Sequence, residues 1–73
     1  MPEYRKVKGR IVEIYGSQAL FAKKLGVSEQ TITNKLRGKV QFTQEDIFRW
    51  CNALDLTKDE VGDYFFAHKL SKS

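Results

Sequence analysis

Apolar residues along this chain recur at spacings of three and four positions. No stretch alternates between apolar and polar residues with the period of two that a half-buried strand shows. The spacing predicts helices over residues 5–15, 18–25, about 29–37, about 44–54 and from 58 onward. Because links of at most six residues join these five short helices, we expect a compact all-α domain.

Each predicted helix carries its apolar residues on one face, as does a helix that packs against a core. The residues expected in the core are Val7, Ile11, Ile14, Leu20, Phe21, Leu25, Ile32, Leu36, Ile47, Trp50, Cys51, Leu54, Val61, Tyr64 and Phe65. The chain has nine aromatic side chains, which can support such a core and argue against disorder.

Residues that commonly begin and end helices stand at the predicted boundaries. Glycines follow the first three helices, at Gly16, Gly26 and Gly38. Hydroxyl side chains precede the second, third and fourth helices as N-caps, at Ser17, Ser28 and Thr43. Thr57 and Glu60 are spaced as a capping box at the start of the fifth helix. We expect the tail from Ala67 to fray.

Length and composition exclude several classes of protein. The 73 residues, 30% charged and 41% apolar, suffice for one domain over 1–73 but not for two cores. No apolar run approaches the roughly 20 residues of a membrane helix, and the N-terminus lacks a secretory apolar segment. Cys51 alone forms no internal disulfide, which favours a reducing compartment, and with His68 it provides too few ligands for structural zinc. We therefore expect no metal, cofactor or small-molecule ligand and, since no nucleophile–base pair is evident, no enzyme activity.

The charges are divided unevenly along the chain, whose net charge is +4. Residues 1–10 carry a net +3 and residues 16–40 a net +4, whereas residues 41–64 carry a net −4. A folded domain with this division has a dipole whose basic end attracts a polyanion. The alternative is a charged surface that serves only solubility.

The segment 17–38, SQALFAKKLGVSEQTITNKLRG, predicts two helices joined by a turn too short for them to run antiparallel. This geometry requires a small residue where the helices cross, which Ala22 provides, and a residue that tolerates positive φ in the turn, which Gly26 provides four positions later. It also requires apolar residues that face back toward the first helix of the pair, namely Val27, Ile32 and Leu36.

On these residues, segment 17–38 resembles the helix-turn-helix of the lambda-repressor and Cro family of phage and bacterial transcriptional regulators. The order of five helices over about 5–66 also resembles that family's small DNA-binding domain. The chain departs from the family's pattern at one position. Many members of that family have an apolar residue where Lys35 stands, whereas here the apolar residue is the adjacent Leu36. This difference affects the expected rotation of the third helix about its axis. The resemblance implies a sequence-specific Cro-like repressor that binds a double-stranded DNA operator in the cytoplasm of a bacterial host.

The third helix is expected to read bases in the major groove. With Ile32 and Leu36 turned inward, the opposite face carries Gln30, Asn34 and Arg37. Thr31 and Thr33 flank this face, and Glu29 lies in the first turn. The amides of Gln30 and Asn34 can pair with adenine, and threonine methyls can contact thymine, so we expect an A·T-containing half-site. The Glu29 carboxylate either accepts a hydrogen bond from cytosine or only complements the helix dipole. The alternative for the amides is a solvated helix surface.

A second set of residues is expected to contact phosphates: Ser17, Gln18, Ser28, Lys35, Arg37, Lys39 and Thr43. Free N–H groups at the starts of helices favour anions, and the cations add attraction that weakens with salt. The resemblance implies that Gln18 grips a phosphate and braces the reading helix. The basic residues 1–10 form either an arm in an adjacent groove or the solvated face of the first helix.

The resemblance further implies a two-fold dimer on half-sites about 34–36 Å apart. Candidate dimer or partner residues are Phe65, Phe66 and Leu70. The alternative is that these side chains pack against the first helix. The acidic stretch and these aromatic residues also leave open a second function, in which the protein is an antirepressor that binds another phage repressor protein.

Overall fold

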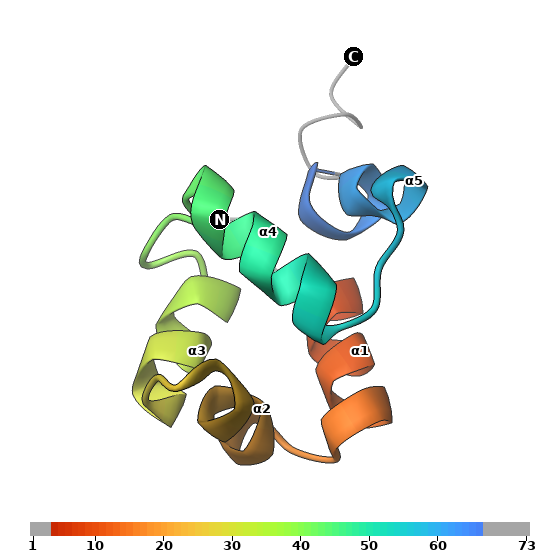
Figure 1. The fold of residues 1–73 in the computed structure, drawn as a ribbon. Helices are drawn as coiled ribbons and strands as arrows, with labels where there is room; N and C mark the ends of the chain where they lie inside the picture. The colour runs from red at the N-terminus through yellow and green to blue at the C-terminus, as the bar shows by residue number, and fades with distance from the viewer. Residues whose placement is uncertain (1–3, 67–73) are drawn as a thin grey trace.

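The computed structural model describes residues 4–66, which form an all-α domain without any strand in that range (Figure 1). Its helices are α1 (Arg5–Tyr15), α2 (Gln18–Leu25), α3 (Glu29–Leu36), α4 (Gln44–Ala53) and α5 (Lys58–Val61), followed by the π-helical segment η1 (Gly62–Phe66). Helix α2 packs against α1, α3 and α4, and α1 also contacts α3 and η1. The predicted all-α class and the first four predicted helices are confirmed to within a residue at each end.

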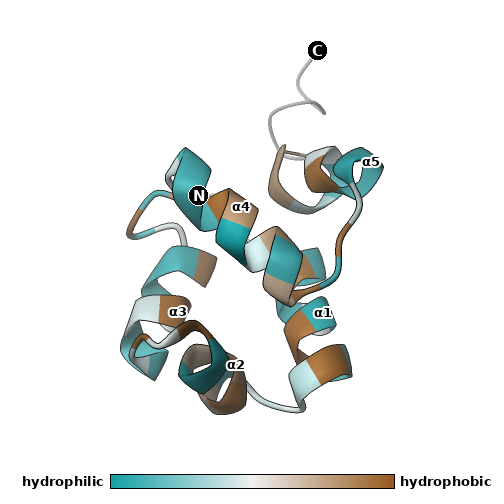
Figure 2. Ribbon diagram, in the orientation of Figure 1, coloured by the Kyte–Doolittle hydropathy of each residue, from teal (hydrophilic) through white to brown (hydrophobic). Residues whose placement is uncertain are grey.

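The core lies where the inner faces of these helices meet. Its buried members are Val7, Ile11, Phe21, Ala22, Ile32, Leu36, Trp50, Cys51, Leu54 and Phe65. Aromatic rings pack edge to face at its centre, with Trp50 4.9 Å from Phe21 and 4.7 Å from Phe42 between ring centroids. Figure 2 shows hydrophobic and hydrophilic residues sharing each of α1 to α4, as expected for amphipathic helices.

Two residues predicted to be buried are exposed. Leu20 is 54% exposed because Phe21 and the crossing residue Ala22 define the inner face of α2. Ile14 is 40% exposed because the next residue, Tyr15, takes the inner position. The Tyr15 ring lies 5.2 Å from that of Phe21, between ring centroids.

The predicted caps bound the helices. The hydroxyl oxygens of Ser17 and Ser28 accept hydrogen bonds from backbone N–H groups one turn later. Thr43 and Asp46 form a reciprocal capping box, with N···O distances of 2.9 and 3.0 Å. The backbone N–H of Thr57 donates to the Glu60 carboxylate at 2.9 Å, which confirms the predicted pairing of those two residues.

Three long side chains satisfy carbonyl groups at the ends of other helices. Arg49 donates to the Leu25 carbonyl at the end of α2, at 2.8 Å. Arg10 donates to the carbonyl of Leu54 at 2.9 Å, after the end of α4. The Tyr15 hydroxyl donates to the Ala53 carbonyl in the last turn of α4 at 2.6 Å. Arg10 and Arg49 thus contribute hydrogen bonds that stabilise the fold.

The last helical segment differs from the continuous helix predicted from residue 58. Four residues of α-helix change into the π-helical η1, whose wider turn seats Phe65 in the core. The Phe65 ring lies 5.1 Å from Phe42 and 6.2 Å from Tyr4, between centroids. The tail from Ala67, including Leu70 and His68, lies outside the described residues.

Candidate nucleic-acid interface

The candidate interface starts from the tight turn between α2 and α3. Gly26 has φ of +76°, and the N–H groups of Gly26 and Val27 donate to the carbonyls of Lys23 and Ala22 at 3.2 and 3.0 Å. A residue with a Cβ is strained at this φ, so glycine lets the chain turn immediately after α2. Ala22 is 3% exposed and Ile32 fully buried where the two helices pack, as the sequence predicts for a helix-turn-helix.

The outer side of α3 presents an amide pair. The Gln30 side chain is exposed, and its Nε2 donates to Oδ1 of the half-buried Asn34 at 3.0 Å. This bond uses one N–H of Gln30 and the carbonyl oxygen of Asn34. It leaves the carbonyl oxygen of Gln30 and the N–H groups of Asn34 for an external partner. Glu29 is also exposed, one residue before this pair.

The two threonines of α3 lie at the edges of this face, and their hydroxyls already have partners. Thr31 Oγ1 lies 2.9 Å from Ser28 Oγ, at the start of the helix. Thr33 Oγ1 donates to Gln18 Oε1 at 3.2 Å, which links α3 to the first residue of α2. Glu29, Gln30 and Asn34 therefore form the open part of the predicted base-reading set, with Thr31 and Thr33 flanking it.

Apart from Lys35, the predicted phosphate-contacting residues separate into two groups. The hydroxyls of Ser17, Ser28 and Thr43 act as N-caps and accept backbone hydrogen bonds. Arg37 and Lys39 are exposed at the end of α3, and the half-buried Gln18 stands at the start of α2. Gln18, Arg37 and Lys39 lie around one groove.

Lys35, a predicted phosphate contact, is not among the residues that line this groove. Its Nζ forms an ion pair with Asp46 Oδ2 at 2.8 Å, and the two side chains are 12% and 21% exposed. The same ammonium lies 5.8 Å from the centroid of the Phe42 ring. Lys35 thus places its ammonium near an aromatic ring and pairs its charge with α4.

The ion pair also affects the pKa of Asp46. Burial by itself raises the pKa of this carboxyl, but the hydrogen bonds from Lys35 and Thr43 outweigh burial, so the pKa is lowered from its ordinary 3.8. Asp46 therefore connects α3 to the start of α4 while it is ionised. No pattern in the sequence indicates this residue as a partner of α3.

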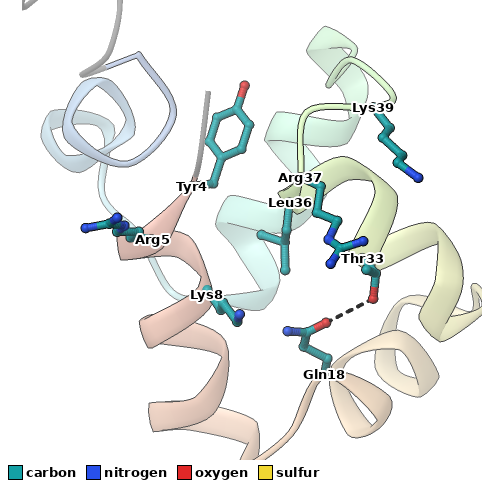
Figure 3. A pocket seen from close by; sticks show the side chains of 8 residues that line it. All are labelled: Tyr4, Arg5, Lys8, Gln18, Thr33, Leu36, Arg37 and Lys39. Atoms are coloured by element: carbon teal, nitrogen blue, oxygen red, sulfur yellow. Dashed lines mark hydrogen bonds between the residues drawn. The ribbon is translucent and has the colours of Figure 1, made fainter. Parts of the chain in front are cut away.

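A groove of about 730 Å³ opens between the start of α1 and the end of α3 (Figure 3). It is lined by Tyr4, Arg5, Lys8, Gln18, Thr33, Leu36, Arg37 and Lys39. The lining includes four cationic side chains and no carboxylate. Lys8 is a lining residue that was not predicted individually as a site residue. The signal in the sequence that could have identified Lys8 is the pair of basic residues at positions 5 and 8, which lie on one side of a helix.

The candidate dimer residues occupy different environments. Phe65 is 2% exposed and packs beneath α1, so the alternative interpretation, packing within the domain, is correct for this residue. Phe66 is half-buried, and Leu70 lies outside the described residues. Within the described part of the chain, no group of three His, Cys, Asp or Glu residues could hold a metal ion. No helix there has the length and apolarity needed to cross a membrane.

A model of a known protein family matches residues 2–68 of the chain. The matching family is described as "Protein of unknown function (DUF739)", and the chain belongs to it. No curated protein matches the chain.

Proposed function

We propose that this DUF739 protein is a sequence-specific double-stranded DNA-binding transcriptional regulator, a Cro-like repressor of a phage or prophage, that inserts α3 into the major groove of its operator. The single observation that carries the proposal is the outward-facing amide pair Gln30–Asn34 on a helix whose other side is buried. An α-helix with its side chains is about 10–12 Å across and the major groove about 12 Å wide, so α3 fits as a unit.

The free groups of the amide pair match a base edge. Adenine presents an N6 donor and an N7 acceptor in the major groove. The carbonyl oxygen of Gln30 can accept from N6, and an N–H of Asn34 can donate to N7. The bond between the two amides restricts both side chains before binding, which reduces the entropy lost on contact.

Other contacts support the orientation of α3 against DNA. The Gln18–Thr33 hydrogen bond fixes the start of α2 beside α3, and the N–H groups at the start of α2 favour an anion. Arg37 and Lys39 add positive charge at the far end of the helix. Such contacts set the position on the duplex, while the amides set the sequence.

The test begins by selecting duplexes from a random pool and measuring their affinity by fluorescence anisotropy. Asn34→Ala and Gln30→Ala should each lose about 1–3 kcal/mol of binding free energy on the selected duplex and relax the base preference at one position. Asn52→Ala is the matched control, since Asn52 is exposed on α4. A pool that yields no enriched sequence, or equal losses in all three variants, would contradict the proposal.

A second candidate function, antirepression by binding another phage repressor protein, is favoured by one specific observation. Phe48 on α4 is 67% exposed, and the acidic Glu45 lies one turn away on the same helix. An exposed aromatic residue of this kind is suited to a protein interface. This function would be supported over the first if the protein co-purifies with a phage repressor and Phe48→Ser abolishes the co-purification. Duplex binding by the protein should then be absent, or unchanged in Phe48→Ser.

A further inference from the structure

The groove between α1 and α3 gathers positive charge from α1 and from the end of α3. The ion pairs Arg10–Glu13 and Lys35–Asp46 do not involve Lys8, Arg37 or Lys39. Lys8, Arg37 and Lys39 are exposed and make no hydrogen bond or ion pair with another described side chain. Because like charges held close together repel, the groove favours an anionic ligand.

The polar groups of the groove converge in a way that suits a phosphate. Since Gln18 Oε1 accepts from Thr33, its amide nitrogen is left as a donor. In Figure 3 this nitrogen and the ammonium of Lys8 point toward one another, and the Arg37 guanidinium lies across the groove near Thr33, whereas Arg5 points away. Three donors from α1, α2 and the end of α3 therefore surround one space.

We propose that this groove binds the sugar-phosphate backbone of one DNA strand and that Lys8 of α1 is a phosphate-contacting residue in it. The inference rests on the proposed function, because the strand that enters the groove is that of the duplex read by α3. Thr33 and Arg37 lie one turn apart on the flank of α3 next to Gln30 and Asn34. A backbone that borders the reading face therefore passes the opening of the groove.

DNA fits the groove better than an acidic polypeptide does. The side chains that line the groove are four cations and the polar Gln18 and Thr33, with Tyr4 and the buried Leu36 as its aromatic and aliphatic members. Protein interfaces depend on a desolvated apolar centre, whereas a nucleic-acid backbone is held by cations and N–H donors. Gln18, which is proposed to lie beside a phosphate, also lines the basic groove.

The test compares the salt dependence of duplex binding in Lys8→Ala with that in Lys58→Ala. Both variants remove one exposed lysine, but Lys58 lies on α5 and does not line the groove. Losing one phosphate contact lowers the slope of log affinity against log salt by about 0.9. Between about 50 and 200 mM salt, the advantage of wild type over Lys8→Ala should therefore shrink about 3.5-fold. Lys58→Ala should keep the wild-type slope, and Lys8→Arg should restore it.

The Lys8→Ala loss should be the same on selected and random duplexes, because a phosphate contact carries no sequence information. If Lys8→Ala and Lys58→Ala share one slope while Asn34→Ala still loses base preference, the groove assignment is wrong and the proposed function stands. If wild type binds no duplex, the proposed function itself fails.

Two further measurements distinguish other anions. NMR titration with inorganic phosphate alone should cause only weak, unsaturated shifts at Lys8, and tight saturation would indicate a free-anion site and overturn the backbone assignment. Polyglutamate should bind no more weakly to Lys8→Ala than to wild type. Lys8-dependent capture of polyglutamate without a Lys8 effect on duplex binding would assign the groove to an acidic protein instead.

Discussion

The two flanks of α3 each have a lysine nearby, and the two lysines have opposite surroundings. At the junction with α4, Lys35 is 12% exposed and its charge is neutralised by Asp46. At the groove beside α1, Lys8 is exposed and shares the space with the cations Arg37 and Lys39. A basic residue in a sequence therefore contributes to attraction of a polyanion only if the fold does not already use its charge. The first flank anchors α3 to α4, and the second lines the groove.

The same division exists between the inner and outer sides of α3. Ile32 is fully buried, whereas Gln30, two positions earlier, is exposed. The inner side determines whether the helix is held in place, and the outer side determines what it contacts. Substitutions on the two sides should thus separate stability from DNA binding.

The largest expected effect is on the inner side. Ile32→Ala should lower the free energy of unfolding by about 2–5 kcal/mol, because it removes buried methyl groups and leaves a cavity beneath α3. Gln30→Ala should change it by no more than about 0.5 kcal/mol. Urea denaturation followed by circular dichroism measures both. If Ile32→Ala leaves no folded population, Ile32→Val, with an expected loss of about 0.5–1.5 kcal/mol, provides the measurement. Equal losses for Ile32→Ala and Gln30→Ala would show that the two sides of α3 are not distinct.

A smaller effect is expected at the junction with α4. Asp46→Ala removes the acceptor of Lys35 and half of the capping box with Thr43, and it leaves the ammonium of Lys35 near an aromatic ring without its counter-charge. Hydrogen bonds to charged groups contribute about 1.5–3 kcal/mol, so a loss in this range is expected in urea denaturation. Glu45→Ala is the matched control, since that exposed carboxylate lies in the same turn of α4. A loss no greater than that of Glu45→Ala would mean that the ion pair does not anchor α3.

The sequence predicts the helices well because the residues at which each helix begins and ends are determined by nearby residues. Apolar spacing, caps and helix-ending glycines are all encoded within a few residues, and the four longer helices follow them closely. The errors arise where two apolar residues compete for one inner position. Tyr15 displaces Ile14 because its hydroxyl also reaches the Ala53 carbonyl, which is distant in sequence. The change to a π-helix at Gly62 likewise has no local pattern that indicates it.

The site is only partly predictable for the same reason. The outward position of Gln30 follows from helical periodicity once Ile32 and Leu36 face inward. The partners of Lys35 and Lys8 depend on how α4 and α1 lie against α3, which the spacing within one helix does not contain. The sequence does not indicate that Asp46, eleven residues later, accepts a hydrogen bond from Lys35, a predicted phosphate contact.

The smallest expected effect concerns pH and again separates the two flanks of α3. Because the pKa of Asp46 is lowered in the folded protein, its ion pair stabilises the fold fully above the ordinary value of 3.8, and this stabilisation is lost as the pH falls through that value and below it. Asp46→Asn, which cannot ionise, should therefore lose less stability than wild type between about pH 5 and 3, measured as the shift in the urea midpoint. Glu45→Gln, in the same turn, should retain the wild-type loss. If Asp46→Asn loses as much stability in acid as wild type does, other carboxylates account for the acid sensitivity. One such group is Glu60, whose pKa is lowered by the hydrogen bond from the Thr57 backbone. The flank of α3 that pairs with α4 would then not be the acid-sensitive one.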